Sequence, residues 1–168
     1  RLWDATSGKQ TLAITGHQKE KTQADVYLAA FSPDGKRLAT ASHDLSVNLW
    51  QVSDGKELKT FKGHIGFVRA VVFSPDGTQI ATASADRTAR LWDVKTGKST
   101  KTFSGHTGVL FDVAFSADGK SLVTASDDQT VRLWDVASGA EQAVLNGHTG
   151  DVLSIAISPD GQTIFSSG

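Results

Sequence analysis

The sequence predicts an all-β protein assembled from repeated four-stranded units. One reason is a period of 42 residues, which separates Trp50 from Trp92 and Trp92 from Trp134. Another is a series of short runs rich in β-branched residues and bounded by Asp and Gly, which is typical of strands. A third is that no window of about 10–12 residues keeps the 3.6-residue apolar period of a helix. Repetition at this spacing indicates a repeat architecture.

One unit, taken in order from 99 to 136, contains four predicted strands. The segment 99–105 ("STKTFSG") is polar, which predicts a half-exposed strand, and 109–116 ("VLFDVAFS") is almost wholly apolar, which predicts a buried one. The segments 121–126 ("SLVTAS") and 130–136 ("TVRLWDV") alternate in polarity and carry β-branched residues, so both are predicted strands. Polar turns of hairpin length separate them.

The turn that follows the apolar strand of each unit has a repeated sequence. Ser-Pro-Asp-Gly suits a type I turn, because Pro supplies the fixed φ at the second position and Gly ends the turn without a Cβ clash. This turn stands at 32–35, 74–77 and 158–161, with Ser-Ala-Asp-Gly at 116–119.

A four-stranded antiparallel unit of this length, with "GH" near one end and "LWD" near the other, resembles the WD-repeat β-propeller family. The resemblance covers essentially the whole chain. The regular sequence of the repeats is similar to that of bacterial WD-repeat regions fused to kinases or nucleotide-hydrolysing switch domains. It implies a β-propeller whose blades are four-stranded antiparallel sheets. The motifs are "GH" at 16–17, 63–64, 105–106 and 147–148, and "LWD" at 2–4, 91–93 and 133–135.

The sequence departs from this pattern in two places. The second unit reads "LWQ" at 49–51, so Gln51 replaces the final Asp. The distance from His17 to His64 is 47 residues, and we assign the extra five to an insertion, "KTQAD", at 21–25. This insertion is expected to protrude on the same face as the predicted partner surface.

The repeats predict a single propeller region over 1–168, with about four blades. One blade is predicted to be split between 1–15 and 151–168. Three arrangements are open: a closed four-bladed ring within one chain, a homodimer that exchanges halves into an eight-bladed ring, or a piece of a longer protein. The absence of an initiator Met favours a longer parent chain. Blades of the WD type are shaped for seven- or eight-fold rings, which favours the dimer for the isolated polypeptide.

Composition excludes several classes of function. Seventeen Lys and Arg residues against 18 Asp and Glu give no basic footprint for nucleic acid. The longest apolar run, 26–31, is far below the roughly 20 residues of a membrane helix. Without cysteine there is no disulfide or thiolate site, and a cytoplasmic location is expected. No cofactor or metal is expected, because four of the five histidines occupy the repeat position, one to a blade.

The stretch "ASDDQTVRLWD" places Ser126 and Asp128 near His106, as in a nucleophilic triad. Its recurrence in other units argues against an enzyme, which needs one constellation and one substrate cleft. The resemblance implies instead a hydrogen-bond chain from His through Ser and Asp to the Trp indole, which ties the strands of a blade together. The expected members are His17, Ser42, Asp44 and Trp50; His64, Ser84, Asp86 and Trp92; and His106, Ser126, Asp128 and Trp134. A chain at His148 is expected to be incomplete, because Gly168 replaces the serine.

The resemblance also implies a partner surface at the face formed by the loops that start strand one and join strands two and three. The residues at these positions vary between blades while the scaffold residues do not, which suits a composite binding surface. For Phe67 and Phe111 an alternative is packing between blades, and for His43 a plain surface residue. The expected binding residues are Asp25, Tyr27, His43, Phe67, Arg69, Phe111, Asp127, Asp151 and Leu153.

The predicted function is therefore a non-catalytic scaffold that binds a protein or peptide, as a regulatory or sensing region of a larger protein. One alternative is an enzyme with its active site at the central channel. Asp112 is the main polar residue in the predicted inner strands and would be the candidate there. Another is a passive structural module that assembles into a larger ring.

Overall fold

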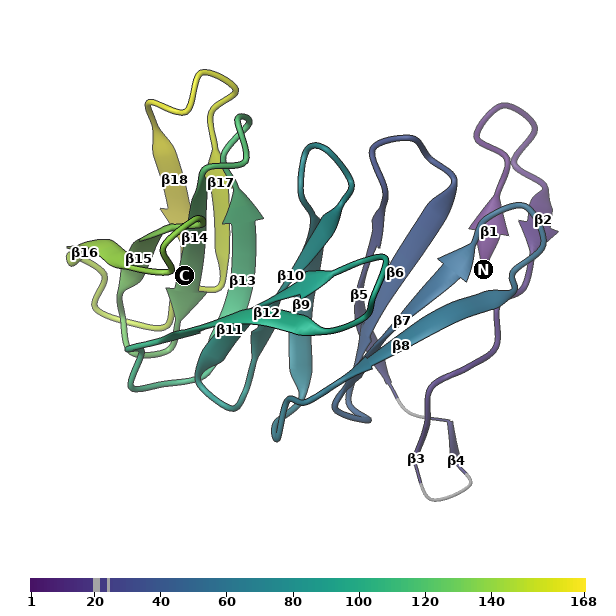
Figure 1. Cartoon of the computed structure of the whole chain (residues 1–168), viewed down its shortest axis with the longest axis horizontal. Coiled ribbons are helices and arrows are strands. Elements are labelled where there is room, and N and C mark those ends of the chain that lie inside the picture. Colours follow the sequence, from purple (N-terminus) through teal and green to yellow (C-terminus); the bar gives the residue numbers. More distant parts are fainter. Residues whose placement is uncertain (20–21, 24) are drawn as a thin grey trace.

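Three complete four-stranded antiparallel sheets stand side by side in an arc, each formed by one repeat (Figure 1). This structure, a computed structural model, describes residues 1–19, 22–23 and 25–168. The first blade contains β5 (Val26–Phe31), β6 (Arg37–Ser42), β7 (Ser46–Gln51) and β8 (Glu57–Lys62). The second contains β9 (Val68–Phe73), β10 (Gln79–Ser84), β11 (Thr88–Asp93) and β12 (Ser99–Ser104), and the third contains β13 (Leu110–Phe115), β14 (Ser121–Ser126), β15 (Val131–Asp135) and β16 (Glu141–Leu145).

Two further two-stranded sheets lie at opposite ends of the arc (Figure 1). One is β1 (Leu2–Trp3) with β2 (Gln10–Leu12), and the other is β17 (Ser154–Ile157) with β18 (Ile164–Ser167). These correspond to strands three and four, and to strands one and two, of a blade.

The predicted insertion at 21–25 lies partly outside the described residues, which exclude 20, 21 and 24. Its described part forms β4 (Thr22–Gln23), which pairs antiparallel with β3 (Gln18–Lys19). Throughout the described ranges there is no helix long and apolar enough to cross a membrane.

The Ser-Pro-Asp-Gly turns close by backbone and side-chain hydrogen bonds together. Gly35 N donates to Ser32 O at 2.8 Å, and Gly35 has φ +68°, a left-handed conformation that glycine adopts without a Cβ penalty. The Asp34 carboxylate accepts from Ser32 Oγ and from Lys36 N. The sequence thus sets the hairpin between the first two strands locally, before any packing with another blade.

The hydrophobic core lies between neighbouring blades rather than inside each sheet. Ala39, Val47 and Phe61 of the first blade pack with Val71 and Ile80 of the second, and the same arrangement repeats from blade to blade. The second strand of each blade is therefore buried on both faces, although its sequence alternates. Its polar positions are buried because they carry the hydrogen-bond network of the blade.

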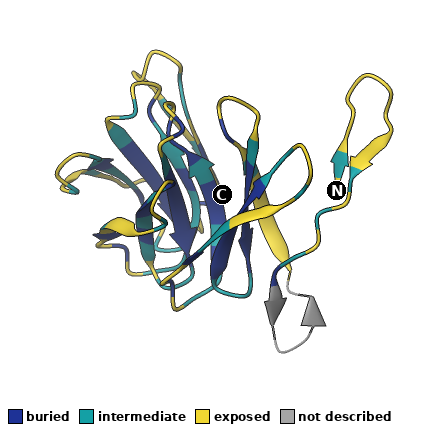
Figure 2. Ribbon diagram, turned by 45° about the vertical axis from the view of Figure 1, so that its right-hand side comes forward, coloured by how far each residue is buried: buried dark blue, intermediate teal, exposed yellow. Residues whose placement is uncertain are grey.

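The inner strands β5, β9, β13 and β17 are neighbours in space (Figure 1). Each complete blade thus runs from an inner strand to a more exposed outer strand, such as β12. Figure 2 shows that burial is concentrated in the complete blades, whereas the β1–β2 hairpin is largely exposed.

Candidate functional site

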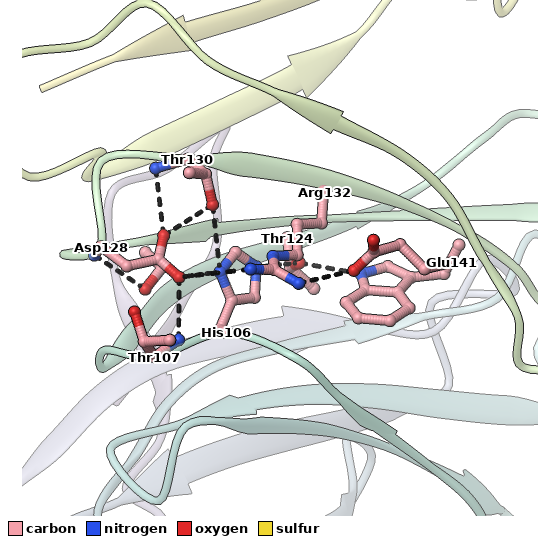
Figure 3. A network of polar contacts seen from close by, with 9 residues as sticks. His106, Thr107, Thr124, Asp128, Thr130, Arg132 and Glu141 are labelled. Carbon is pink, nitrogen blue, oxygen red and sulfur yellow. Dashed lines mark hydrogen bonds and ion pairs between the residues drawn. The ribbon is translucent and has the colours of Figure 1, made fainter.

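A hydrogen-bond chain crosses the third blade from its tryptophan to its aspartate (Figure 3). The Trp134 indole Nε1 donates to Thr124 Oγ1 at 2.9 Å. The same hydroxyl lies 2.7 Å from His106 Nε2, and His106 Nδ1 lies 2.8 Å from Asp128 Oδ2. Thr124 is fully buried and His106 nearly so, which makes this a closed polar chain inside a hydrophobic blade.

Four further hydrogen bonds hold the Asp128 side chain and backbone in place. The Thr130 hydroxyl and amide donate to Oδ1 at 2.6 and 3.0 Å, and the Thr107 amide donates to Oδ2 at 3.0 Å (Figure 3). The Asp128 amide in turn donates to Ser126 Oγ at 3.1 Å. These bonds join the loop before β13 to the turn between β14 and β15 at one aspartate.

The charge state that satisfies this chain is a neutral His106 and an ionised Asp128. Burial lowers the pKa of His106 below 6.5 despite the neighbouring carboxylate. Burial alone would raise the pKa of Asp128, but hydrogen bonds from Thr130, Thr107 and His106 lower it to about 2. A neutral imidazole donates through Nδ1 and accepts through Nε2 from the threonine hydroxyl, whose oxygen accepts from the indole. Each polar atom then has a complementary partner.

The structure places the serines differently from the sequence-based expectation. A threonine, two residues before each serine, links the histidine to the tryptophan, while the serine oxygen accepts from the aspartate backbone amide. The reason is the register between β10 and β11. Trp92 pairs with Ile80, so Thr82 is the diagonal neighbour of the tryptophan. Ser84 lies four residues beyond Ile80, about 13 Å further along the strand. The bonded sets are His17, Thr40, Asp44 and Trp50, then His64, Thr82, Asp86 and Trp92, and then the set of the third blade described above.

These constellations cannot receive a substrate. Thr82 and Thr124 are fully buried, as are Ser84 and Ser126, so no hydroxyl of either set reaches a surface where a substrate could bind. An active nucleophile needs hydrogen-bond contact with its base and access to the reacting atom. The serines make no hydrogen bond to the histidine, and none of the four buried hydroxyls has access to a reacting atom.

His148 keeps only part of the chain. Its Nε2 lies 2.7 Å from Ser166 Oγ, and Ser166 occupies the position of the linking threonine. The equivalent tryptophan by sequence is Trp3, which is 60% exposed and lies at the other end of the arc, whereas Trp92 and Trp134 are 2% exposed.

Each inner strand of the complete blades carries a β-bulge near its start. On β9, Val68 pairs with Ser84 and Ala70 with Ala83, so Arg69 is an extra residue between them. The same shift makes Tyr27 the extra residue on β5 and Phe111 the extra residue on β13. Because a bulge turns a side chain out of the strand alternation, it presents these three residues at one end of their blades.

The bulge residues contact one another across blades. The Arg69 guanidinium lies over two rings, 4.7 Å from the Tyr27 centroid and 5.6 Å from that of Phe111. His43, in the turn between β6 and β7, lies 5.9 Å from the Tyr27 ring and 3.4 Å from the Phe67 ring. We name these five residues, which span three blades, the aromatic–arginine strip: Phe67, His43, Tyr27, Arg69 and Phe111.

The comparison with protein families agrees with this geometry. A family model described as "WD domain, G-beta repeat" matches residues 8–51, 55–93, 97–135 and 139–168. The chain belongs to the WD-repeat family. Its fold is accordingly that of a β-propeller with four-stranded antiparallel blades and 42-residue WD repeats.

Several curated proteins match segments of this WD-repeat chain. "Notchless protein homolog" of Arabidopsis thaliana is 44% identical over 66 residues, which are 39% of this chain and 13% of that protein. "Ribosome assembly protein 4" of Saccharomyces cerevisiae is 43% identical over 61 residues, or 36% and 11% of the two chains. "Probable serine/threonine-protein kinase PkwA" of Thermomonospora curvata is 48% identical over 49 residues, or 29% and 7%. The WD-repeat chain therefore matches only a small part of the length of these relatives.

The other predicted binding residues lie around the strip at the same end of the blades. The Asp25 carbonyl accepts from the His43 amide at 2.9 Å, and the Asp127 amide donates to Val109 O at 3.0 Å, so both belong to the loops expected there. Asp151 is exposed before β17, and Leu153, at the position equivalent to Arg69, is 52% exposed.

Phe67 and Phe111 combine the two roles that the sequence left open. Phe67 contacts His43 of the first blade, and Phe111 contacts Arg69 of the second, so both pack across a boundary between blades. Both are also only half-buried and remain accessible on the face. His43 likewise is no isolated surface residue, because its ring contacts two other rings of the strip.

Two sets of hydroxyl residues were absent from the sequence-based list. One is the linking threonines, Thr40, Thr82 and Thr124, and the other comprises Ser46, Thr88 and Thr130, whose hydroxyls donate to the network aspartates at 2.6 Å. Both sets recur at 42-residue spacing, which is the signal that could have found them.

Proposed function

We propose that this WD-repeat chain is an interaction scaffold that presents the aromatic–arginine strip to a protein or peptide partner, as a regulatory or sensing region of a larger protein. The observation that carries the proposal is the unbroken set of side-chain contacts from Phe67 to Phe111 across three blades. Family members are generally non-catalytic scaffolds. One matched relative is named for ribosome assembly and another as a kinase, and both names fit a scaffold within a larger system.

The strip has the physical properties of a binding surface. Tyr, Phe and Arg are residue types that contribute strongly to binding energy at interfaces. The strip residues are held by contacts with one another and by the buried networks below, so a partner has little side-chain freedom to freeze on binding. The half-exposed rings also offer apolar area, since Tyr27 is 39% exposed.

The channel carboxylate on which the enzyme alternative relied is already used within the fold. Asp112 Oδ2 accepts from Ser154 Oγ at 3.2 Å and from the Ile155 amide at 3.0 Å. Its Oδ1 accepts from the Val113 amide at 2.9 Å. A carboxylate bonded in this way links the third blade to β17, and this supports the scaffold over catalysis at that position.

Selection of a displayed library of random peptides for binding to the purified chain tests the scaffold proposal. We expect selected peptides to compete for one site and to lose at least about tenfold in affinity with Tyr27→Ala, since a hot-spot truncation costs about 2 kcal/mol. The control is Lys120→Ala, an exposed side chain in the turn between β13 and β14. Peptides that bind both variants like the wild type would refute the assignment of the face, and a failure to select any peptide would favour a passive spacer.

We also infer that a second copy of the chain completes the blade at each end of the arc and closes an eight-bladed ring. Sheet β17–β18 supplies strands one and two of a blade, and β1–β2 supplies strands three and four. Joined between copies, they would bring Trp3 of one chain to the His148–Ser166 pair of the other, as Trp134 reaches Thr124 within the third blade.

Differences in burial between equivalent repeat positions support this assembly. Val26 is 47% exposed at the start of β5, although its equivalents Val68 and Leu110 are fully buried against a preceding blade. A hollow of about 350 Å³ beside β5 is lined by Leu2, Phe31 and Trp50, among others. The exposed side of β5 therefore lacks the two inner strands of a preceding blade. Strands β17 and β18 of a second copy can supply them.

Light scattering on the purified chain tests the assembly. The expected mass is twice the 17.8 kDa of one chain, and Trp3→Asp should shift the population toward the monomer. A wild-type mass of one chain at all concentrations would overturn the dimer while leaving the scaffold proposal standing.

A further inference from the structure

Two aromatic rings hold the Arg69 side chain in place, and no carboxylate of the described residues pairs with it. Its guanidinium lies between the Tyr27 and Phe111 rings, and its Nε is enclosed with no hydrogen-bond acceptor among the described residues. The Arg69 side chain as a whole is half-buried at the start of β9. Arg132, by comparison, donates to Glu141 at 2.6 Å. Arg69 is thus a positioned cation without a charge partner among the described residues.

A guanidinium fixed between two rings is well suited to bind a carboxylate. Both ring centroids lie within 5.6 Å of the guanidinium carbon, and the planar fork of N–H groups matches the geometry of a carboxylate acceptor. The stacking also removes most of the side-chain freedom that an exposed arginine would lose on binding. Apolar groups next to the bound carboxylate would meet the exposed parts of the two rings.

The charges around the strip favour a singly charged acid. Asp25 and Asp151 are exposed near the strip and Asp127 is half-buried, while Arg87 in the β10–β11 turn and Lys62, which pairs with Ser46 beside the β6–β7 turn, are exposed cations at the same end of the blades. The charges of this face are therefore about balanced, which disfavours a dianionic phosphate more than a monoanionic carboxylate.

We propose that Arg69 is the anchor for a carboxylate of the partner, so that the aromatic–arginine strip selects peptides with an acidic side chain or a free C-terminus. This inference rests on the proposed scaffold function and adds the chemical class of the partner. It assigns Tyr27 and Phe111 the role of holding the guanidinium and contacting apolar groups on either side of the acid.

Peptide libraries with one fixed position test the proposal. Acetylated, amidated hexapeptides carry Glu, Asp, Gln, Asn or phosphoserine at one position, and a second neutral library carries a free C-terminus. We expect the wild type to bind the Glu and Asp pools at least about tenfold better than the Gln and Asn pools, because a hydrogen bond to a charged group contributes about 1.5–3 kcal/mol. Preference for the free C-terminus in the second library would identify a chain end as the source of the carboxylate.

Three variants separate the role of Arg69 from general charge. Arg69→Leu places at this bulge the residue type that Leu153 provides in its own repeat, and it should abolish the acidic preference. Arg69→Lys keeps the charge but not the planar fork, and it should lose most of the preference. Arg87→Gln is the matched control: it removes one charge from the same face, and Gln129 occupies the equivalent position with the same backbone conformation. It should behave like the wild type.

The outcomes distinguish this inference from the scaffold proposal. Acidic selectivity that persists in Arg69→Leu, or a stronger preference for the phosphoserine pool, would overturn the carboxylate anchor. Peptide binding that falls with Tyr27→Ala but shows no acidic preference would also overturn it, while leaving the scaffold proposal in place. A wild-type chain that binds no pool would contradict both.

Discussion

Replacing Thr82 with valine tests whether the linking threonine holds a blade together. Thr82 is fully buried, and its hydroxyl lies 2.7 Å from His64 Nε2 and 2.9 Å from Trp92 Nε1. Valine has the same shape but no hydroxyl, so the change removes both hydrogen bonds without creating a cavity. The indole donor and the imidazole nitrogen would then be buried without partners.

The size of the effect follows from these two orphaned atoms. Each buried polar group left without a partner costs about 1–3 kcal/mol, so Thr82→Val should lower the free energy of unfolding by roughly 2–6 kcal/mol. For a protein of this length, each kcal/mol lowers Tm by about 2–4 °C, which gives a decrease on the order of 5–20 °C.

Thermal unfolding followed by circular dichroism and tryptophan fluorescence measures this difference. The matched control is Thr102→Val, the same replacement at an exposed position of β12, which should change Tm by less than about 2 °C. The reasoning fails if the Tm of Thr82→Val lies within about 2 °C of that of Thr102→Val, because the network would then contribute little to stability.

Three further predictions concern pH, backbone strain and close packing. The pKa of Asp128 is lowered to about 2 in the fold, so its contribution to stability is present above about pH 4 and is lost as pH falls toward 2. The lowered pKa of His106 adds a loss as pH falls through about 6.5, because the unfolded chain takes up the proton first. Urea unfolding between pH 7.5 and 2.5 should show both losses, with a smaller slope below pH 4 in Asp128→Asn, and a flat profile would contradict this account. Gln129 has φ +68°, which a β-branched residue tolerates poorly, so Gln129→Val should lower the free energy of unfolding by about 1–2 kcal/mol in the same assay while Gln129→Gly should not. A Cβ at Gly66 would lie 2.5 Å from the Asp86 amide nitrogen, so Gly66→Ala should cost about 1–3 kcal/mol of stability and weaken peptide capture, and wild-type values for both would show that the loop adapts.

The sequence alone was enough for the elements of this fold, because they depend on local chemistry and periodicity. Turns such as that at Gly35 close through bonds between residues two to five positions apart, so their sequence predicts their geometry. The 42-residue spacing of Trp50, Trp92 and Trp134 likewise predicted one blade per repeat. The pairs of histidine and aspartate could also be predicted, because both residues recur at fixed positions in each unit.

Only the tertiary structure decided which hydroxyl completes each network. Thr82 and Ser84 point to the same face of β10 and are equally plausible in sequence. The register with β11 brings Thr82, and not Ser84, within reach of the Trp92 indole, and strand register depends on pairing along the whole sheet.

The same holds for the strip. A bulge at Arg69 and the curvature of the arc bring Tyr27 and Phe111, each 42 residues away, to within 5.6 Å of its guanidinium carbon. The sequence placed these residues on one face, but a cation between two rings arises only when three blades pack side by side. Contacts between repeats depend on how the blades stack, which no single repeat specifies.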